Sequence, residues 1–81
     1  MDDGLFTGIE EIDAQIRFAE KAYDEMYDAR SAASAMACFS ELKDSFSAAI
    51  ALADERGLKE KAELLRRRLE HCKQVYRRQF S

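Results

Sequence analysis

Apolar residues recur at helical intervals in three separate blocks of the chain. In the first block they occupy positions 9, 12, 16, 19, 23 and 26, and these steps of three and four residues place every side chain on one stripe of a helix. Thr7 is followed three residues later by Glu10, which is the spacing of a capping box. The pattern therefore predicts a helix over residues 7–30 that begins near Thr7.

The second block is out of phase with the first. Its stripe consists of positions 35, 39, 42, 46, 49 and 53, whereas a continuation of the first stripe would reach mostly small or polar residues. The change of phase falls within residues 28–35, where Ser31 or Ser34 can serve as the N-cap of a helix over residues 34–56. Because this stretch contains neither proline nor glycine, one long continuous helix is the alternative that the pattern leaves open.

A sharp turn separates the second block from the third. Gly57 suits the left-handed position that follows a helix C-terminus, and Leu58 can pack back on the last turn. The third stripe runs through positions 58, 62, 65, 69, 72 and 76 and predicts a helix over residues 58–79. The fold class is therefore predicted to be all-α, a three-helix up-down-up antiparallel bundle.

Length and composition fit one small domain. The 81 residues are 47% hydrophobic and include no proline, which favours a folded helical chain over a disordered one. We expect residues 1–6 to form a flexible N-terminus and residues 7–81 to form a single three-helix domain. No apolar run approaches the roughly 20 residues of a membrane span, and the acidic start is unlike a secretory signal. We therefore expect a cytoplasmic protein with no membrane contact.

Charge is distributed unevenly along the chain. Residues 1–30 carry nine acidic and three basic side chains, whereas residues 58–81 carry three acidic and eight basic ones. In an up-down-up bundle the first and third helices run parallel, so we expect the acidic first helix to pair with the basic third one. The alternative is a nucleic-acid-binding surface, which the interspersed glutamates weaken. Its candidate residues are Arg66, Arg67, Arg68, Lys73, Arg77 and Arg78.

No arrangement of residues in the sequence indicates an active site. His71 and Cys72 are adjacent, so on a helix their side chains point about 100° apart and cannot easily act on one atom. With Cys38 added, the three residues still lack the spacing of a zinc site, and no glycine-rich phosphate-binding loop occurs. We therefore expect no enzyme, no catalytic residue, no metal site and no cofactor.

Several large apolar residues lie outside the three stripes. Scattered exposed apolar residues are normal in globular proteins, and this is the plain interpretation of these positions. The alternative is a contact surface for a partner helix or for a second copy of the chain, in a homodimer. We therefore predict a small non-catalytic protein–protein interaction module or regulator, with a nucleic-acid-binding regulator as the alternative. The candidate contact residues are Phe18, Tyr27, Leu64, Val75 and Phe80.

One part of the chain, residues 38–78, resembles known helical domains. The stretch "CFSELKDSFSAAIALADERG" resembles the second helix of tetratricopeptide-like repeats and of MIT domains, and "LKEKAELLRRRLEHCKQVYRR" resembles the basic third helix of an MIT bundle. The first helix departs from the MIT pattern. The resemblance implies binding of a helical peptide or protein in a groove between helices. The positions that carry it are Phe39, Leu42, Phe46, Ala49 and Ile50.

Overall fold

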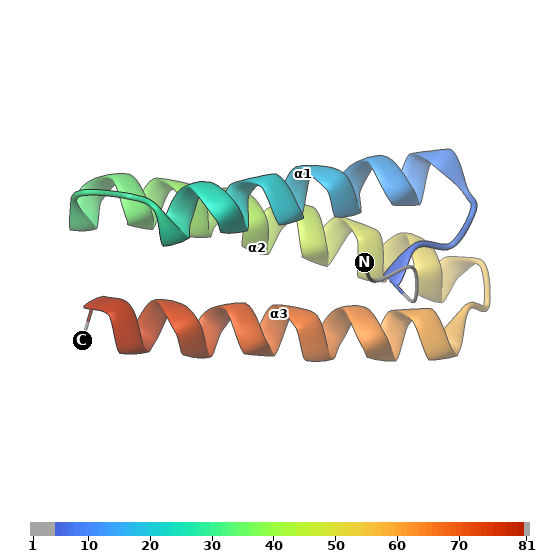
Figure 1. The fold of residues 1–81 in the computed structure, drawn as a ribbon. Coiled ribbons are helices and arrows are strands. Elements are labelled where there is room, and N and C mark those ends of the chain that lie inside the picture. The colour runs from blue at the N-terminus through green and yellow to red at the C-terminus, as the bar shows by residue number, and fades with distance from the viewer. Residues whose placement is uncertain (1–4, 81) are drawn as a thin grey trace.

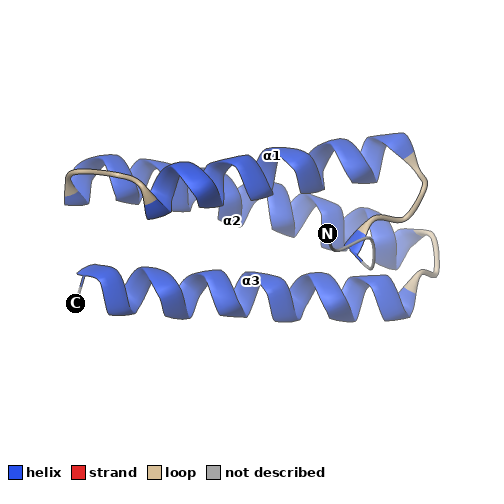
Figure 2. Cartoon of the chain, viewed as in Figure 1, coloured by secondary structure: helices blue, strands red, loops and turns tan. Residues whose placement is uncertain are grey.

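The fold is a bundle of three antiparallel helices joined by two short turns. The computed structural model describes residues 5–80, without the side chain of Phe80. The helices are α1 (Glu10–Tyr27), α2 (Ala32–Glu55) and α3 (Lys59–Phe80), and they run up, down and up (Figure 1). The described residues contain no strand (Figure 2), and none of their helices is long and apolar enough to cross a membrane. The predicted all-α three-helix bundle is confirmed.

The three predicted stripes form the core of the bundle. Its largest fully buried side chains include Ile12 and Ile16 of α1, Phe46 of α2 and Leu65 of α3. Full burial of a side chain of this size contributes about 1.5–3 kcal/mol to folding, so the stripes decide which faces of the helices meet. Residues at the edges of the stripes, such as Tyr23, are half-buried and pack against this core.

A Schellman motif ends α2, as the sequence predicts. Gly57 has a φ of +76°, a conformation that side chains with a β carbon rarely adopt. The Gly57 N–H donates to the Asp54 carbonyl at 3.1 Å, and the Leu58 N–H donates to the Ala53 carbonyl at 2.8 Å. This turn reverses the chain and sets α3 antiparallel to α2.

Ser31 is the N-cap of α2. Its hydroxyl accepts a hydrogen bond from the Ser34 N–H at 3.1 Å, so Ser31 is confirmed as the cap among the two serines considered. The helix consequently begins at Ala32, two residues before the predicted start. Residues 28–31 form the connection between α1 and α2, and the change of phase between the two stripes occurs there, so one continuous helix is excluded.

The capping box predicted at Thr7 and Glu10 is wrong. Helix α1 begins at Glu10, and its N-cap residue, Ile9, makes no side-chain capping hydrogen bond. Instead, Asp13 Oδ1 accepts hydrogen bonds from the Thr7 N–H at 2.8 Å and the Thr7 hydroxyl at 2.9 Å. Asp13 Oδ2 accepts a third from the Gly8 N–H at 3.0 Å. Asp13 is buried, although it lies off the apolar stripe of the first helix.

The segment before α1 folds back over the bundle, from the start of α1 toward α3 (Figure 1). Leu5 is buried and Phe6 packs against the core. Both belong to residues 1–6, which the sequence analysis assigned to a flexible N-terminus; residues 1–4 lie outside the described part of the chain. Gly8, with a φ of +85°, permits the reversal of the backbone between this segment and the helix.

Candidate functional site

The groove between α1 and α3 holds a hollow of about 350 Å³ and is bridged by side chains of the chain itself. Leu5 and Phe6 line it together with Glu20 of α1 and Arg68 of α3. Arg68 donates two hydrogen bonds to the Glu20 carboxylate, at 2.8 Å from Nε and 2.6 Å from Nη2, and the two side chains are only 28% and 29% exposed. The Arg68 guanidinium also lies 4.8 Å from the centroid of the Tyr23 ring. We call this the bridged groove.

The basic residues of α3 fall into two groups of different character. Lys73, Arg77 and Arg78 form no ion pair within residues 5–80. By contrast, each of the three consecutive arginines pairs with a carboxylate: Arg66 with Asp54 of α2 at 2.6 Å, Arg67 with Glu63 of α3 itself at 3.6 Å and Arg68 with Glu20 of α1 at 2.6 Å. Half of the predicted nucleic-acid surface is therefore engaged by the protein's own acids, and the expected pairing of the first and third helices is present at Glu20.

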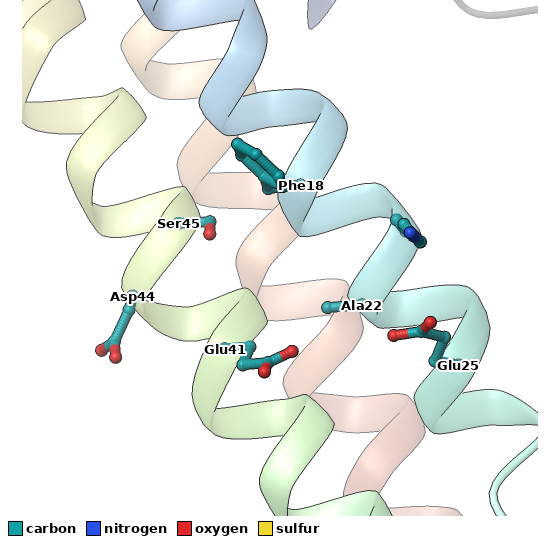
Figure 3. Close-up of a pocket in the computed structure, with 7 residues that line it drawn as sticks. Phe18, Ala22, Glu25, Glu41, Asp44 and Ser45 are labelled. Carbon is teal, nitrogen blue, oxygen red and sulfur yellow. The ribbon is translucent and has the colours of Figure 1, made fainter.

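The groove between α1 and α2 is open and acidic. It forms a hollow of about 360 Å³, and we call it the acidic groove (Figure 3). Figure 3 shows Glu25 of α1 and Glu41 of α2 extending their carboxylates toward each other. Neither they nor Asp44 forms an ion pair in the described part of the chain. The side chains that line the groove are Phe18, Lys21, Ala22, Glu25, Glu41, Asp44 and Ser45.

Phe18 gives the acidic groove an apolar anchor. Its side chain is 63% exposed, the highest value among the large apolar residues of the described chain. Burying the exposed part of a phenylalanine releases about 1–2 kcal/mol, and buried aromatic residues are typical centres of binding energy at protein interfaces. Among the residues predicted from sequence to contact a partner, Phe18 is the one that lines this groove.

The other predicted contact residues lie elsewhere. Tyr27 is 61% exposed, its ring stacks on that of Tyr23 with centroids 6.4 Å apart, and its carbonyl accepts a hydrogen bond from Gln79 Nε2 of α3 at 2.9 Å. Leu64 is 38% exposed and lies beside other α3 residues on the outer face of that helix. Val75 is half-buried against the core, and the side chain of Phe80 is not among the described ones. The predicted set therefore does not form one surface.

The groove between α2 and α3 is open and basic. It is a hollow of about 350 Å³ lined by Phe39 and Lys43 of α2 and by Lys73, Tyr76 and Arg77 of α3, and we call it the basic groove. The rings of Phe39 and Tyr76 are stacked, with centroids 4.3 Å apart and planes within 1°. Lys43 Nζ lies 5.3 Å from the Phe39 centroid. The three cations form no ion pair among the residues described.

The sequence analysis did not predict that these residues share a groove. There Phe39 and Tyr76 belong to core stripes, and Lys73 and Arg77 are among the candidate nucleic-acid-binding residues. The available signal was position: Phe39 is near the start of its stripe and Tyr76 near the end of its own, and in an antiparallel hairpin these ends meet. The sequence analysis also omitted Met36 from the candidate contact residues, although its side chain is 59% exposed near the start of α2.

Both thiols are held in their protonated form at neutral pH. Cys72 is fully buried, and burial raises the pKa of its thiol to about 11 against the opposing charge of Arg68. Cys38 is half-buried, and burial together with the carboxylates of Glu25 and Glu41 raises its pKa. Neither cysteine is in a disulfide, and residues 5–80 bring no three potential metal ligands together.

Comparison of the chain with models of protein families, with curated proteins and with solved structures gives no significant match. The resemblance of residues 38–78 to tetratricopeptide-like and MIT domains therefore stays a prediction. What the chain does has to be argued from its own surface.

Proposed function

We propose that this protein is a non-catalytic interaction module that binds another protein in the acidic groove. The observation that carries the proposal is the 63% exposed ring of Phe18 beside carboxylates that have no cationic partner in the described structure. A ring at this position contributes little to folding, because most of it remains in water. The free energy of burying this ring is therefore available to stabilise a complex with a partner.

The chemistry of the groove defines the partner that fits it. Glu25, Glu41 and Asp44 repel one another, and basic side chains on a partner would relieve that repulsion. Lys21 offsets part of this charge at the same groove. The matching surface is therefore apolar at its centre, to cover Phe18, and basic at its rim. An amphipathic helix with lysine or arginine on its flanks has both properties.

A nucleic-acid-binding regulator is the weaker candidate. Binding to nucleic acid requires unpaired cations to replace counterions on the phosphates. Of the six basic residues proposed from sequence, Arg66, Arg67 and Arg68 are already paired with carboxylates of the bundle. Three phosphate contacts would give a slope of only about −3 for the dependence of log K on log salt concentration.

The test uses a model helix that has the proposed partner chemistry. A synthetic amphipathic peptide of leucine and lysine, labelled with a fluorophore, is titrated with the protein, and binding is followed by anisotropy. We expect a dissociation constant in the micromolar range, and a loss of at least about tenfold in affinity for Phe18→Asp. A matched peptide with glutamate in place of lysine is expected not to bind.

Leu64→Asp supplies the matched control, because it places the same charge at an exposed apolar residue of α3 outside the groove. Its affinity for the peptide should stay within about twofold of wild type, and both variants should unfold at the denaturant concentration of wild type within error. Equal binding by wild type and Phe18→Asp, or no binding of the lysine peptide to wild type, would show that the acidic groove is not the binding site.

A further inference from the structure

The two open grooves of the bundle have opposite charge and different shape. At the acidic groove Phe18 is exposed, and Glu25, Glu41 and Asp44 supply negative charge. The basic groove instead has a floor of two half-buried aromatic rings and a rim of three cations. The exposed ring and the carboxylates of the acidic groove are therefore complementary to the recess and the cations of the basic groove.

The basic groove matches an acidic segment with an apolar side chain better than it matches single-stranded nucleic acid. Single-stranded nucleic acid binds by stacking bases on free aromatic faces. Here one face of Phe39 and one face of Tyr76 are used in stacking with each other, and Lys43 lies over the Phe39 ring. The cations and the recess of about 350 Å³ remain for carboxylates and one apolar side chain.

We infer that the protein bound in the acidic groove is a second copy of this chain, which presents its basic groove. Phe18 of one copy enters the recess over the Phe39–Tyr76 pair of the next. The carboxylates of Glu41 and Asp44 meet Lys43 and Arg77 across the interface. This inference rests on the proposed function, because it names the partner of the same groove.

The contact joins two different surfaces, so it is heterologous. A single molecule cannot bring its own two grooves into contact, because α2 separates the acidic groove beside α1 from the basic groove beside α3 (Figure 1). In an open assembly, the copy at one end keeps a free acidic groove and the copy at the other end keeps a free basic groove. Repeated head to tail, such contacts continue from copy to copy and produce a closed ring or an open chain.

The first measurement is sedimentation velocity of the wild-type protein from about 10 µM to about 1 mM, in low salt and in about 1 M salt. We expect the weight-average mass to rise with concentration in low salt. In high salt, where charges are screened beyond about 3 Å, the mass should return to that of the monomer.

Two variants disable one groove each. Phe18→Asp removes the anchor of the acidic groove and leaves the basic groove intact, whereas Lys43→Glu with Arg77→Glu reverses the basic groove and leaves Phe18 intact. All three residues are exposed, so the variants should fold, and circular dichroism melts check this. Each variant alone should be monomeric over the same range, with self-association weakened at least about tenfold.

Mixing the two variants gives the decisive result. Each contributes the groove that the other lacks, so the mixture should form a 1:1 heterodimer and no larger species. The two altered grooves are both acidic and cannot pair. Should Lys43→Glu with Arg77→Glu fail to fold, Lys43→Gln with Arg77→Gln removes the same charges without reversing them.

Four outcomes would overturn the inference, and they separate it from the proposed function. In the first, the wild type stays monomeric at about 1 mM in low salt while the leucine–lysine peptide still binds at Phe18. This result would exclude a second copy as the partner and leave the proposed function standing. Self-association that neither variant weakens, or a mixture without heterodimer, would place the contact elsewhere. Binding of a single-stranded oligonucleotide that depends on Lys43 and Arg77, without self-association, would assign the basic groove to nucleic acid.

Discussion

The two grooves that flank α1 use its acidic side chains in opposite ways. On the α3 side, Glu20 is bound by Arg68, and beside that groove Asp13 is bound by Thr7 and Gly8. On the α2 side, Glu25 faces further carboxylates and has no ion pair within residues 5–80. On its α3 side α1 therefore has carboxylates with internal partners, whereas on its α2 side Glu25 has none, although Glu11 at the start of that side pairs with Arg56 just after α2.

The difference separates residues that stabilise the fold from residues left for binding. A carboxylate with its donors inside the chain gains its hydrogen bonds on folding, so its removal lowers the free energy of unfolding. A carboxylate without donors loses nothing on unfolding, so its removal should change binding and leave stability alone. The difference can be tested by experiment. A cysteine, a hydrogen-bonded carboxylate and an ion pair toward α3 each have a matching group elsewhere in the chain.

The largest expected difference is in thiol reactivity. Cys72 is fully buried near Arg68 and Glu20, whereas Cys38 is half-buried near the carboxylates of the acidic groove. Cys38 should react with an aromatic disulfide reagent in the folded protein. Cys72 should react at least about a hundredfold more slowly, because it becomes accessible only when the bundle opens. Mass spectrometry of the labelled wild type assigns the two rates.

Denaturant provides the control for this measurement. In unfolding concentrations of guanidinium the two thiols should react at similar rates, since both are then exposed and their pKa values return toward the ordinary range. If Cys72 reacts as fast as Cys38 in the native protein, the core around Cys72 is not tightly packed in solution.

Replacement of Asp13 should produce the next largest effect. Asp13→Ala removes the acceptor of three hydrogen bonds and leaves the Thr7 and Gly8 N–H groups without a partner. It also frees the segment that holds Leu5 in the core. We expect the free energy of unfolding to fall by about 2–3 kcal/mol, measured by urea denaturation. Asp44→Ala, on the open side, should change it by less than about 0.5 kcal/mol.

The effect of Asp13 should also depend on pH. Burial alone would raise the pKa of its carboxyl, but hydrogen bonds from Thr7 and Gly8 and the charge of Arg17 bring it below its usual value of 3.8. A pKa that is lower in the folded state gives stability that is complete above the unfolded pKa and is lost as the pH falls through the folded one. The gap between wild type and Asp13→Asn should therefore be full at pH 7 and narrow below about pH 4. A gap that stays constant would show that the carboxylate is not the group that holds the segment.

The apolar stripes were predictable because burial in a helical bundle depends mainly on which face a residue occupies. Ile12, Phe46 and Leu65 all lie on predicted stripes and are fully buried. Asp13 was not predictable in this way. Its partners are backbone N–H groups, which every residue carries, and whether they reach the carboxylate depends on how the segment before α1 turns at Gly8.

The candidate site was predictable only in part, for a similar reason. The exposure of Phe18 follows from its position opposite the stripe of α1. That Lys43 of α2 and Arg77 of α3 line one groove depends on the register of two helices across the turn at Gly57. Periodicity describes one helix at a time, and it does not contain this register.

Ion pairs offer the smallest expected difference, and the chain supplies a matched comparison. Arg68–Glu20 is bidentate, joins two helices and is about 70% removed from solvent. Arg67–Glu63 lies within α3, with the atoms 3.6 Å apart and side chains that are mostly exposed. Double-mutant cycles with Arg→Met and Glu→Gln should give a coupling free energy of about 1–2 kcal/mol for the first pair and about 0.3 kcal/mol for the second. Salt of about 1 M should abolish the second coupling and leave most of the first, because the partly buried pair is screened less. Equal couplings for the two pairs would mean that the Arg68–Glu20 pair stabilises the bundle no more than a surface ion pair does, and that the contrast between the two flanks of α1 is one of surface charge alone.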